Sequence, residues 1–389
     1  MRALSSSQGG ARRGLVLAAL LASSLLAGCS SLPSFLGGGS DAPKPAPLAP
    51  NPLLLGVRQA WTAPLGPVSF PLSVQVQGDA VVLGADDGTV AALDAASGRE
   101  LWRAQAGAPL SAGVGSDGKT TAVVPRNHDL VGGGGGKAVS RERLRAQAFT
   151  APLVAGERVF VLAADRSVSA YDGATGRRLW TQERTGEPLV LRQAGLLLAV
   201  GDTLVAGQGG RLVGLNPLNG SIRWEAPIGT SRGTNDIERL VDLVGGASRN
   251  GNSVCARAFQ TAVGCVDAER GTLAWTRPSN GATGVHGDEA RVYGTESDGK
   301  LVAWRRDKGE RAWSVDTLLH RDPTAPLVIG RSVAVGDGFG FVHLLSREDG
   351  RLLNRLSTDG SAIAATPVLA GNTLVVVTRK GAVHGFVPQ

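Results

Sequence analysis

The sequence predicts an all-β protein, an eight-bladed β-propeller of four-stranded antiparallel blades that is closed by the N-terminal strand. Three observations carry this prediction. Six 16-residue segments align without gaps and share a glycine at their twelfth position, and five of the six end in tryptophan. No segment sustains helical periodicity over 10 residues. Glycine supplies 55 of 389 residues, or 14%, which is about twice its ordinary share.

The repeats have a period near 40 residues, which is typical of propeller blades. The segments begin at Asp87, Asp165, Gly209, Gln260, Asp298 and Phe339, and their shared glycines are Gly98, Gly176, Gly220, Gly271, Gly309 and Gly350. Successive glycines are 78, 44, 51, 38 and 41 residues apart. Because 78 is twice 39, a degenerate repeat is expected around residues 120–145, with the glycine run 132–136 replacing its third strand and turn. Alternating runs such as RVFVLAAD and SVSAYD predict the strands.

Blade number and ring closure follow from the two ends of the repeat region. Residues 53–387 give 335 positions, or eight units of about 42. The last repeat stops after GAVHGF, before its glycine turn, whereas WTAPL from Trp61 matches only the end of a repeat. The N-terminal strand should therefore complete the last blade and leave no free sheet edge. Six of the seven tryptophans then occupy equivalent positions, as wedges between blades: Trp61, Trp102, Trp180, Trp224, Trp275 and Trp313.

The first 52 residues predict export and a lipid anchor. Residues 1–28 have the arginines, apolar stretch and small residues of a signal peptide. Leu26-Ala27-Gly28-Cys29 resembles a bacterial lipobox, which implies acylation of Cys29, and Ser30 implies sorting to the outer membrane; a plain signal peptide is the alternative. Residues 29–52 are rich in proline and glycine, which predicts an extended tether. The propeller is expected to occupy residues 53–389.

Several function classes lack support in the sequence. The formal charge is +7 and falls to +4 without residues 1–28, and no basic block interleaved with aromatics follows, so we expect no nucleic-acid partner. HExxH, GxSxG and CxxC are absent and the histidines are scattered, so we expect no catalytic site, metal or cofactor. GVGSDGKT from Gly113 matches a phosphate-binding loop in form, but the following TTAVVP does not open a helix, and a turn is expected.

Cys255 and Cys265 are predicted to face each other across a hairpin centred on Gln260. In an oxidising compartment they could form a disulfide, and two reduced core thiols are the alternative.

The repeat pattern AYDGATGRRLW from Ala170 resembles that of pyrroloquinoline-quinone propellers. Together with the lipobox and eight compact units, the chain resembles the BamB family of the outer-membrane β-barrel assembly machinery. The resemblance implies a non-enzymatic scaffold, facing the periplasm, that docks the POTRA domains of the barrel-forming subunit and assists insertion of β-barrel proteins. EPLVLRQ resembles the family's docking segment, and TNDIERLVDLV resembles its acidic partner loop, although Val244 stands where the family has a second acid. The matching positions are Leu189, Leu191 and Arg192 in the first segment, and Asp242, with Glu238 and Arg239 beside it, in the second.

Both segments follow a strand that ends near a repeat tryptophan, Trp180 and Trp224, so they should be neighbours on one face of the ring. The longest repeat interval, 51, falls between Gly220 and Gly271 and predicts an extended loop there. Alternatively, Leu189 and Leu191 form the inward face of a strand. The rival functions are a quinone-dependent dehydrogenase, which would require vicinal cysteines and acidic calcium ligands, and a scaffold that binds cell-wall polymer or another envelope protein.

Overall fold

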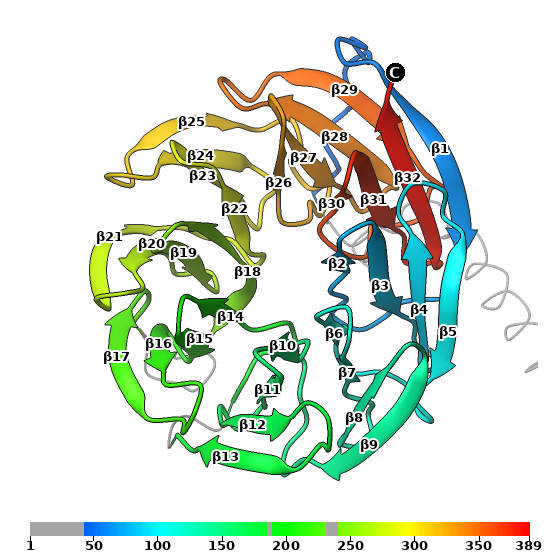
Figure 1. The fold of residues 1–389 in the computed structure, drawn as a ribbon. Coiled ribbons are helices and arrows are strands. Elements are labelled where there is room, and N and C mark those ends of the chain that lie inside the picture. Colours follow the sequence, from blue (N-terminus) through cyan, green and yellow to red (C-terminus); the bar gives the residue numbers. More distant parts are fainter. Residues whose placement is uncertain (1–42, 185–188, 231–239) are drawn as a thin grey trace, which may run out of the picture. The chain divides into compact units, whose positions relative to one another are not determined.

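The computed structural model describes residues 43–184, 189–230 and 240–389. Within these ranges, 32 strands form eight four-stranded antiparallel sheets, arranged as blades around a ring (Figure 1). This confirms the predicted fold class. Residues Pro45–Gln389 form one compact unit. Neighbouring blades contact each other through their first strands, so the first strand of each blade is the inner one and the last lies at the rim.

The first four blades follow chain order. Blade one contains β2 (Gln75–Gln77), β3 (Ala80–Gly84), β4 (Thr89–Asp94) and β5 (Glu100–Gln105); blade two contains β6 (Gly115–Ser116), β7 (Thr121–Val123), β8 (Asp129–Gly134) and β9 (Lys137–Arg143). Blade three contains β10 (Leu153–Ala155), β11 (Arg158–Leu162), β12 (Val168–Asp172) and β13 (Arg178–Gln182); blade four contains β14 (Leu197–Val200), β15 (Thr203–Gln208), β16 (Arg211–Leu215) and β17 (Ile222–Pro227).

The remaining blades continue the pattern until the ring closes. Blade five contains β18 (Leu243–Asn250), β19 (Ser253–Ala258), β20 (Ala262–Asp267) and β21 (Thr272–Pro278); blade six contains β22 (Val285–Gly287), β23 (Arg291–Thr295), β24 (Leu301–Arg305) and β25 (Arg311–Val315). Blade seven contains β26 (Leu327–Ile329), β27 (Ser332–Gly336), β28 (Phe341–Ser346) and β29 (Leu352–Ser357); blade eight contains β30 (Val368–Ala370), β31 (Thr373–Val377), β32 (Ala382–Pro388) and β1 (Val57–Pro64).

Burial explains why the middle strands are so apolar. In β3 and β4, nearly every residue is buried, because both faces of the sheet pack against neighbouring blades. The outer strand β5 alternates between exposed and half-buried residues, since one of its faces meets solvent. The hydrophobic core is therefore divided among the interfaces between blades.

The N-terminal strand closes the ring as predicted. β1 pairs antiparallel with the C-terminal strand β32, from Val57 opposite Pro388 to Pro64 opposite Ala382. The two ends of the sequence thereby share one sheet, and blade eight gains its outer strand. Closure by hydrogen bonding removes the open edges that an incomplete blade would present.

The repeat tryptophans wedge between blades and explain the shared glycines. Trp224, in the outer strand of blade four, covers the turn of blade five at Gly271, where an added Cβ would lie 2.3 Å from the Cβ of Trp224. Gly271 also has φ +70°, which side chains resist. In the neighbouring repeat, the Trp180 indole N–H donates to the carbonyl of Pro217 at 3.0 Å. The same glycine–tryptophan contact recurs at Gly98, Gly220, Gly309 and Gly350.

Blade two corrects one expectation. The glycine run 132–136 does not replace the third strand: Gly132–Gly134 belong to β8, which is that strand, and Gly135 and Gly136 form the turn with positive φ. Strand pairing uses backbone groups, so the three glycines that end β8 still pair with β9 and complete the sheet. The phosphate-loop-like sequence from Gly113 spans β6 and the turn before β7, as expected.

Candidate functional site

The candidate site lies on one face of the ring, here called the connecting face. It consists of the segments that lead from the outer strand of one blade to the inner strand of the next, together with the turns between second and third strands. All inner strands begin at this face and run in the same direction. Every segment that leads to an inner strand therefore lies on the same side of the ring. The turns between first and second strands, and between third and fourth strands, form the opposite face.

Leu189, Leu191 and Arg192 lie in the segment between β13 and β14, on the connecting face. They precede β14, which begins at Leu197, so they do not form the inward face of a strand. Leu189 is 42% exposed, whereas Leu191 is half-buried. Arg192 is exposed, and its guanidinium lies 5.6 Å from the ring centroid of Phe149. A guanidinium at this distance is attracted by the aromatic ring, which favours this position of the Arg192 side chain.

Asp242 ends the corresponding segment between β17 and β18 and reaches across to the first segment. One carboxylate oxygen, Oδ2, accepts the backbone N–H of Leu191 at 3.0 Å. The other, Oδ1, accepts Nε and Nη2 of Arg166 at 3.2 and 3.1 Å. The two segments are therefore neighbours, as their places in the repeats predict. Both carboxylate oxygens have partners within the chain, so Asp242 acts by holding the backbone of the Leu189–Arg192 segment.

Arg166 is the residue that sequence reasoning missed. It lies in the turn between β11 and β12, and its side chain is 11% exposed. Besides binding Asp242, its Nη2 donates to the carbonyl of Leu189 at 2.8 Å. Its φ is +63°, and the matching turns of two sister repeats have Gly88 and Gly299. A bulky residue in this left-handed conformation is strained. The sister turns have the pair Asp-Gly, and the replacement of this glycine by arginine is the signal that could have identified Arg166.

A pocket opens beside the segment. Charged and apolar side chains line the same space, with Arg166 and Asp242 beside the aromatic and aliphatic residues. Its lining includes Phe149, Leu162, Val190, Leu191, Gly207 and Leu243. An apolar hollow with a few fixed polar groups is suited to receiving one side chain of a partner.

Three predicted residues fall outside the residues that the structure describes: Cys29, Glu238 and Arg239. The last two belong to the long interval between Gly220 and Gly271. The flanking residues Val241 and Leu243 are buried, so the part of this segment next to Asp242 is firmly packed.

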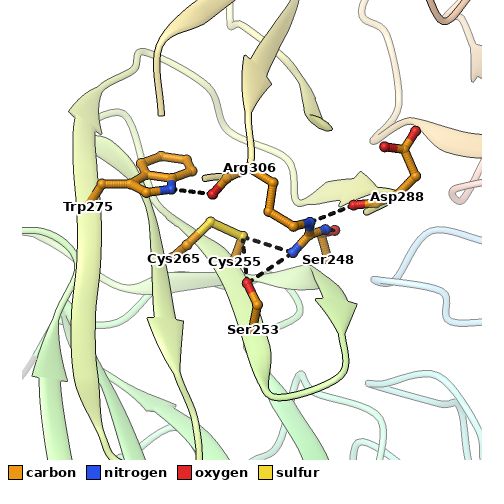
Figure 2. The surroundings of a disulfide bond; sticks show 7 residues. All are labelled: Ser248, Ser253, Cys255, Cys265, Trp275, Asp288 and Arg306. Atoms are coloured by element: carbon orange, nitrogen blue, oxygen red, sulfur yellow. Dashed lines mark hydrogen bonds between the residues drawn. A yellow bond between two sulfur atoms is a disulfide. The ribbon is translucent and has the colours of Figure 1, made fainter. Parts of the chain in front are cut away.

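Cys255 and Cys265 face each other in the register predicted, on β19 and β20. In the structure they form a disulfide with Cα atoms 3.9 Å apart, and both residues are fully buried in blade five. Figure 2 shows Arg306 of blade six beside it, donating from Nη1 to Cys255 Sγ at 3.2 Å and to the Ser253 hydroxyl. Burial lowers the pKa of Arg306 below its ordinary value. The cysteines are not vicinal, unlike the pair expected of a quinone-dependent dehydrogenase.

Two further observations concern the described residues only. No group of three or more His, Cys, Asp or Glu side chains in residues 43–184, 189–230 and 240–389 is arranged to hold a metal ion. In those same ranges, no helix has the length and apolar character needed to cross a bilayer.

Comparison with known proteins gives consistent matches. A family model described as "Outer membrane protein assembly factor BamB" matches residues 86–315. The protein of that name from Burkholderia pseudomallei is 40% identical over 349 residues, which are 89% of this chain and 92% of the relative. Its counterpart from Bordetella pertussis is 36% identical over 374 residues, 95% of each chain.

A solved structure agrees at the level of the fold. The crystal structure of BamB from Moraxella catarrhalis superimposes with a TM-score of 0.78 at 22% identity, covering 85% of this chain and 99% of that one. The family match spans more than half of the chain, and the two relatives cover nearly all of it. The chain therefore belongs to the BamB family of outer membrane protein assembly factors.

Proposed function

We propose that this protein is a non-enzymatic assembly factor for outer-membrane β-barrel proteins, lipid-anchored at Cys29 in the outer membrane and facing the periplasm. The proposed activity is the one that the names of its relatives state, outer membrane protein assembly. In this proposal, residues 1–28 are removed as a signal peptide, the acylated cysteine and tether follow in residues 29–52, and the propeller is the functional body. No cofactor, metal or nucleic acid takes part.

The proposed partner is the barrel-forming subunit, bound through its POTRA domains. Leu189, Leu191 and Arg192 supply the contact from one segment, and Glu238 and Arg239 from the next. The observation that supports this surface most is the fixed backbone beneath Leu189: its carbonyl is held by Arg166, and the N–H of Leu191 is held by Asp242.

Fixing the backbone in this way favours binding. Arginine is enriched at the energetic centres of interfaces, an exposed leucine supplies apolar area to bury beside it, and prior ordering lowers the entropy lost on association. The acidic charge of Asp242 is already matched by Arg166, so the segment presents Arg192 as its cation. We therefore expect an acidic group on the partner opposite Arg192.

Two experiments test the proposal. Calorimetric titration of the mature protein with isolated POTRA domains should give saturable binding, and absence of heat and of co-migration would contradict the docking role. Replacing Cys29 by alanine should release the protein from membranes while circular dichroism stays that of the folded propeller. A Cys29→Ala protein that remains in the outer-membrane fraction would refute the anchor.

A further inference from the structure

Residues 46–55, here called the strap, run along the outer strand of blade seven. The side chain of Asn51 pairs with the backbone of Arg355 in both directions, donating to its carbonyl at 2.9 Å and accepting its N–H at 3.0 Å. Leu54 N–H donates to the carbonyl of Leu353 at 2.8 Å, and the Asn354 amide donates to the carbonyl of Leu55. The strap therefore runs antiparallel to β29 and covers its edge.

The N-terminal end of the strap is clamped to the connecting face. Ala46 N–H donates to the carbonyl of Leu319 at 2.9 Å, and Arg321 Nη1 donates to the carbonyl of Ala46 at 3.2 Å. Arg321 is itself fixed by a 2.8 Å ion pair with the fully buried Asp337. A clamp of this kind resists movement, because displacing Arg321 would remove the arginine partner of a buried carboxylate.

The clamp fixes the face of the ring from which the chain before Ala46 emerges. Leu319 and Arg321 lie between β25 and β26, so Ala46 ends on the connecting face, the face of Leu189 and Asp242. β1 begins at Val57, opposite Pro388 at the end of β32, which is the opposite face. Without the strap, the chain would therefore leave the ring on the side away from the docking segment.

We propose that the strap is an orienting element that turns the docking face of the propeller toward the membrane. This inference rests on the proposed anchor at Cys29. With the strap in place, the 16 residue steps from Cys29 to Pro45 span at most roughly 55 Å, and they start from the connecting face. With the strap released, the 28 steps to Val57 span up to roughly 95 Å and start from the opposite face.

Energy transfer on vesicles tests the orientation. The full-length lipoprotein is reconstituted into phosphatidylethanolamine–phosphatidylglycerol vesicles that carry an acceptor dye on the headgroups. A donor dye is attached at Lys380→Cys or at Asn372→Cys, two exposed positions at opposite ends of β31. They lie on the connecting and the opposite face respectively, about 20 Å apart along the strand. We expect stronger transfer from position 380.

The strap is then released by Ala46→Pro, which removes the N–H donor, together with Asn51→Ala. Both changes lie outside the blades, and the melting temperature verifies that the ring is intact. Transfer from position 372 should now equal or exceed transfer from position 380. Ala49→Ser is the matched control: Ala49 is exposed and its contact with Arg355 uses the backbone carbonyl, so the original preference should persist.

Two results would overturn the proposal: equal transfer from both positions in the parent protein, or an unchanged preference after release of the strap. Calorimetry with POTRA domains in solution does not depend on the anchor. If the parent protein binds POTRA domains normally but shows no preference for position 380, the strap proposal alone is refuted. If the preference is present but POTRA domains do not bind, the docking surface alone is refuted.

Discussion

The carboxylate of Asp242 accepts the backbone N–H of Leu191 at 3.0 Å, although 51 residues separate them in the chain. The bond ties the segment before blade five to the segment before blade four. Arg166 completes the arrangement by binding Asp242 and the carbonyl of Leu189. The exposed part of the Leu189–Arg192 segment, proposed above as the docking segment, thus depends on two residues whose own side chains are largely buried.

This arrangement predicts that Arg166 and Asp242 act as one unit. Arg166→Met and Asp242→Asn should each weaken POTRA binding about tenfold, or about 1.4 kcal/mol, because either change frees the backbone of the docking segment. The double variant should bind no worse than the weaker single one. The exposed pair Arg223–Asp202, which lies away from the docking segment, is the control, and Asp202→Asn should leave affinity unchanged. Additive losses in calorimetric titration would show that the two residues act independently.

The shared glycine of the repeat predicts a graded effect on stability. Gly271→Ala should destabilise the ring more than Gly251→Ala, although both residues have positive φ, +70° and +57°. Each change costs about 1–2 kcal/mol in backbone strain. Only the Cβ at position 271 would collide with Trp224, adding about 1–3 kcal/mol. Chemical denaturation measures both; equal losses would mean that the tryptophan contact contributes nothing.

His286 predicts a loss of stability on acidification. Its Nδ1 accepts the backbone N–H of Val328 at 3.1 Å, which requires the neutral ring, and burial lowers the pKa of His286 below its ordinary value of 6.5. The unfolded chain therefore binds the proton more readily, so this contribution is complete above pH 6.5 and is lost as the pH falls below it.

The test is His286→Asn, whose amide oxygen can replace Nδ1 as acceptor without titrating. The melting temperature of this variant should fall less between pH 7.5 and pH 5.5 than that of the parent protein. The pKa values of His343 and His384 are also lowered by burial, so some pH dependence should remain. Identical pH profiles for the variant and the parent would contradict the role of His286.

The ring could be predicted from the sequence because each repeat carries its own evidence. The glycine turn and the tryptophan wedge recur in register, and a strand at each end of the chain lacks its complement. The third strand of blade two could not be predicted in this way, because its glycines remove the alternation of side chains while leaving the backbone free to pair. The site was predicted in part: the neighbouring segments follow from the repeat, whereas Arg166 occupies a repeat turn where two sister repeats have glycine, and the sequence does not show that its side chain binds Asp242 and Leu189.

The strap shows a different limit. A proline-rich composition predicts an extended chain through residue 52, and the strap is indeed extended. Composition does not reveal that Asn51 pairs with the backbone of Arg355, or that Arg321 on the connecting face donates to the carbonyl of Ala46. These contacts join residues about 300 positions apart in the sequence, so only the folded ring brings them together.

The most direct test of the docking surface is calorimetric titration of the Leu189→Glu, Arg192→Glu double variant with POTRA domains. Interfaces concentrate their energy in a few apolar anchors and arginines, so affinity should fall at least thirtyfold, or about 2 kcal/mol, with the melting temperature unchanged. Leu218→Glu is the control, because Leu218 is 65% exposed on the opposite face. Loss of binding in the folded double variant alone is the predicted result; normal binding by that variant would place the docking surface elsewhere.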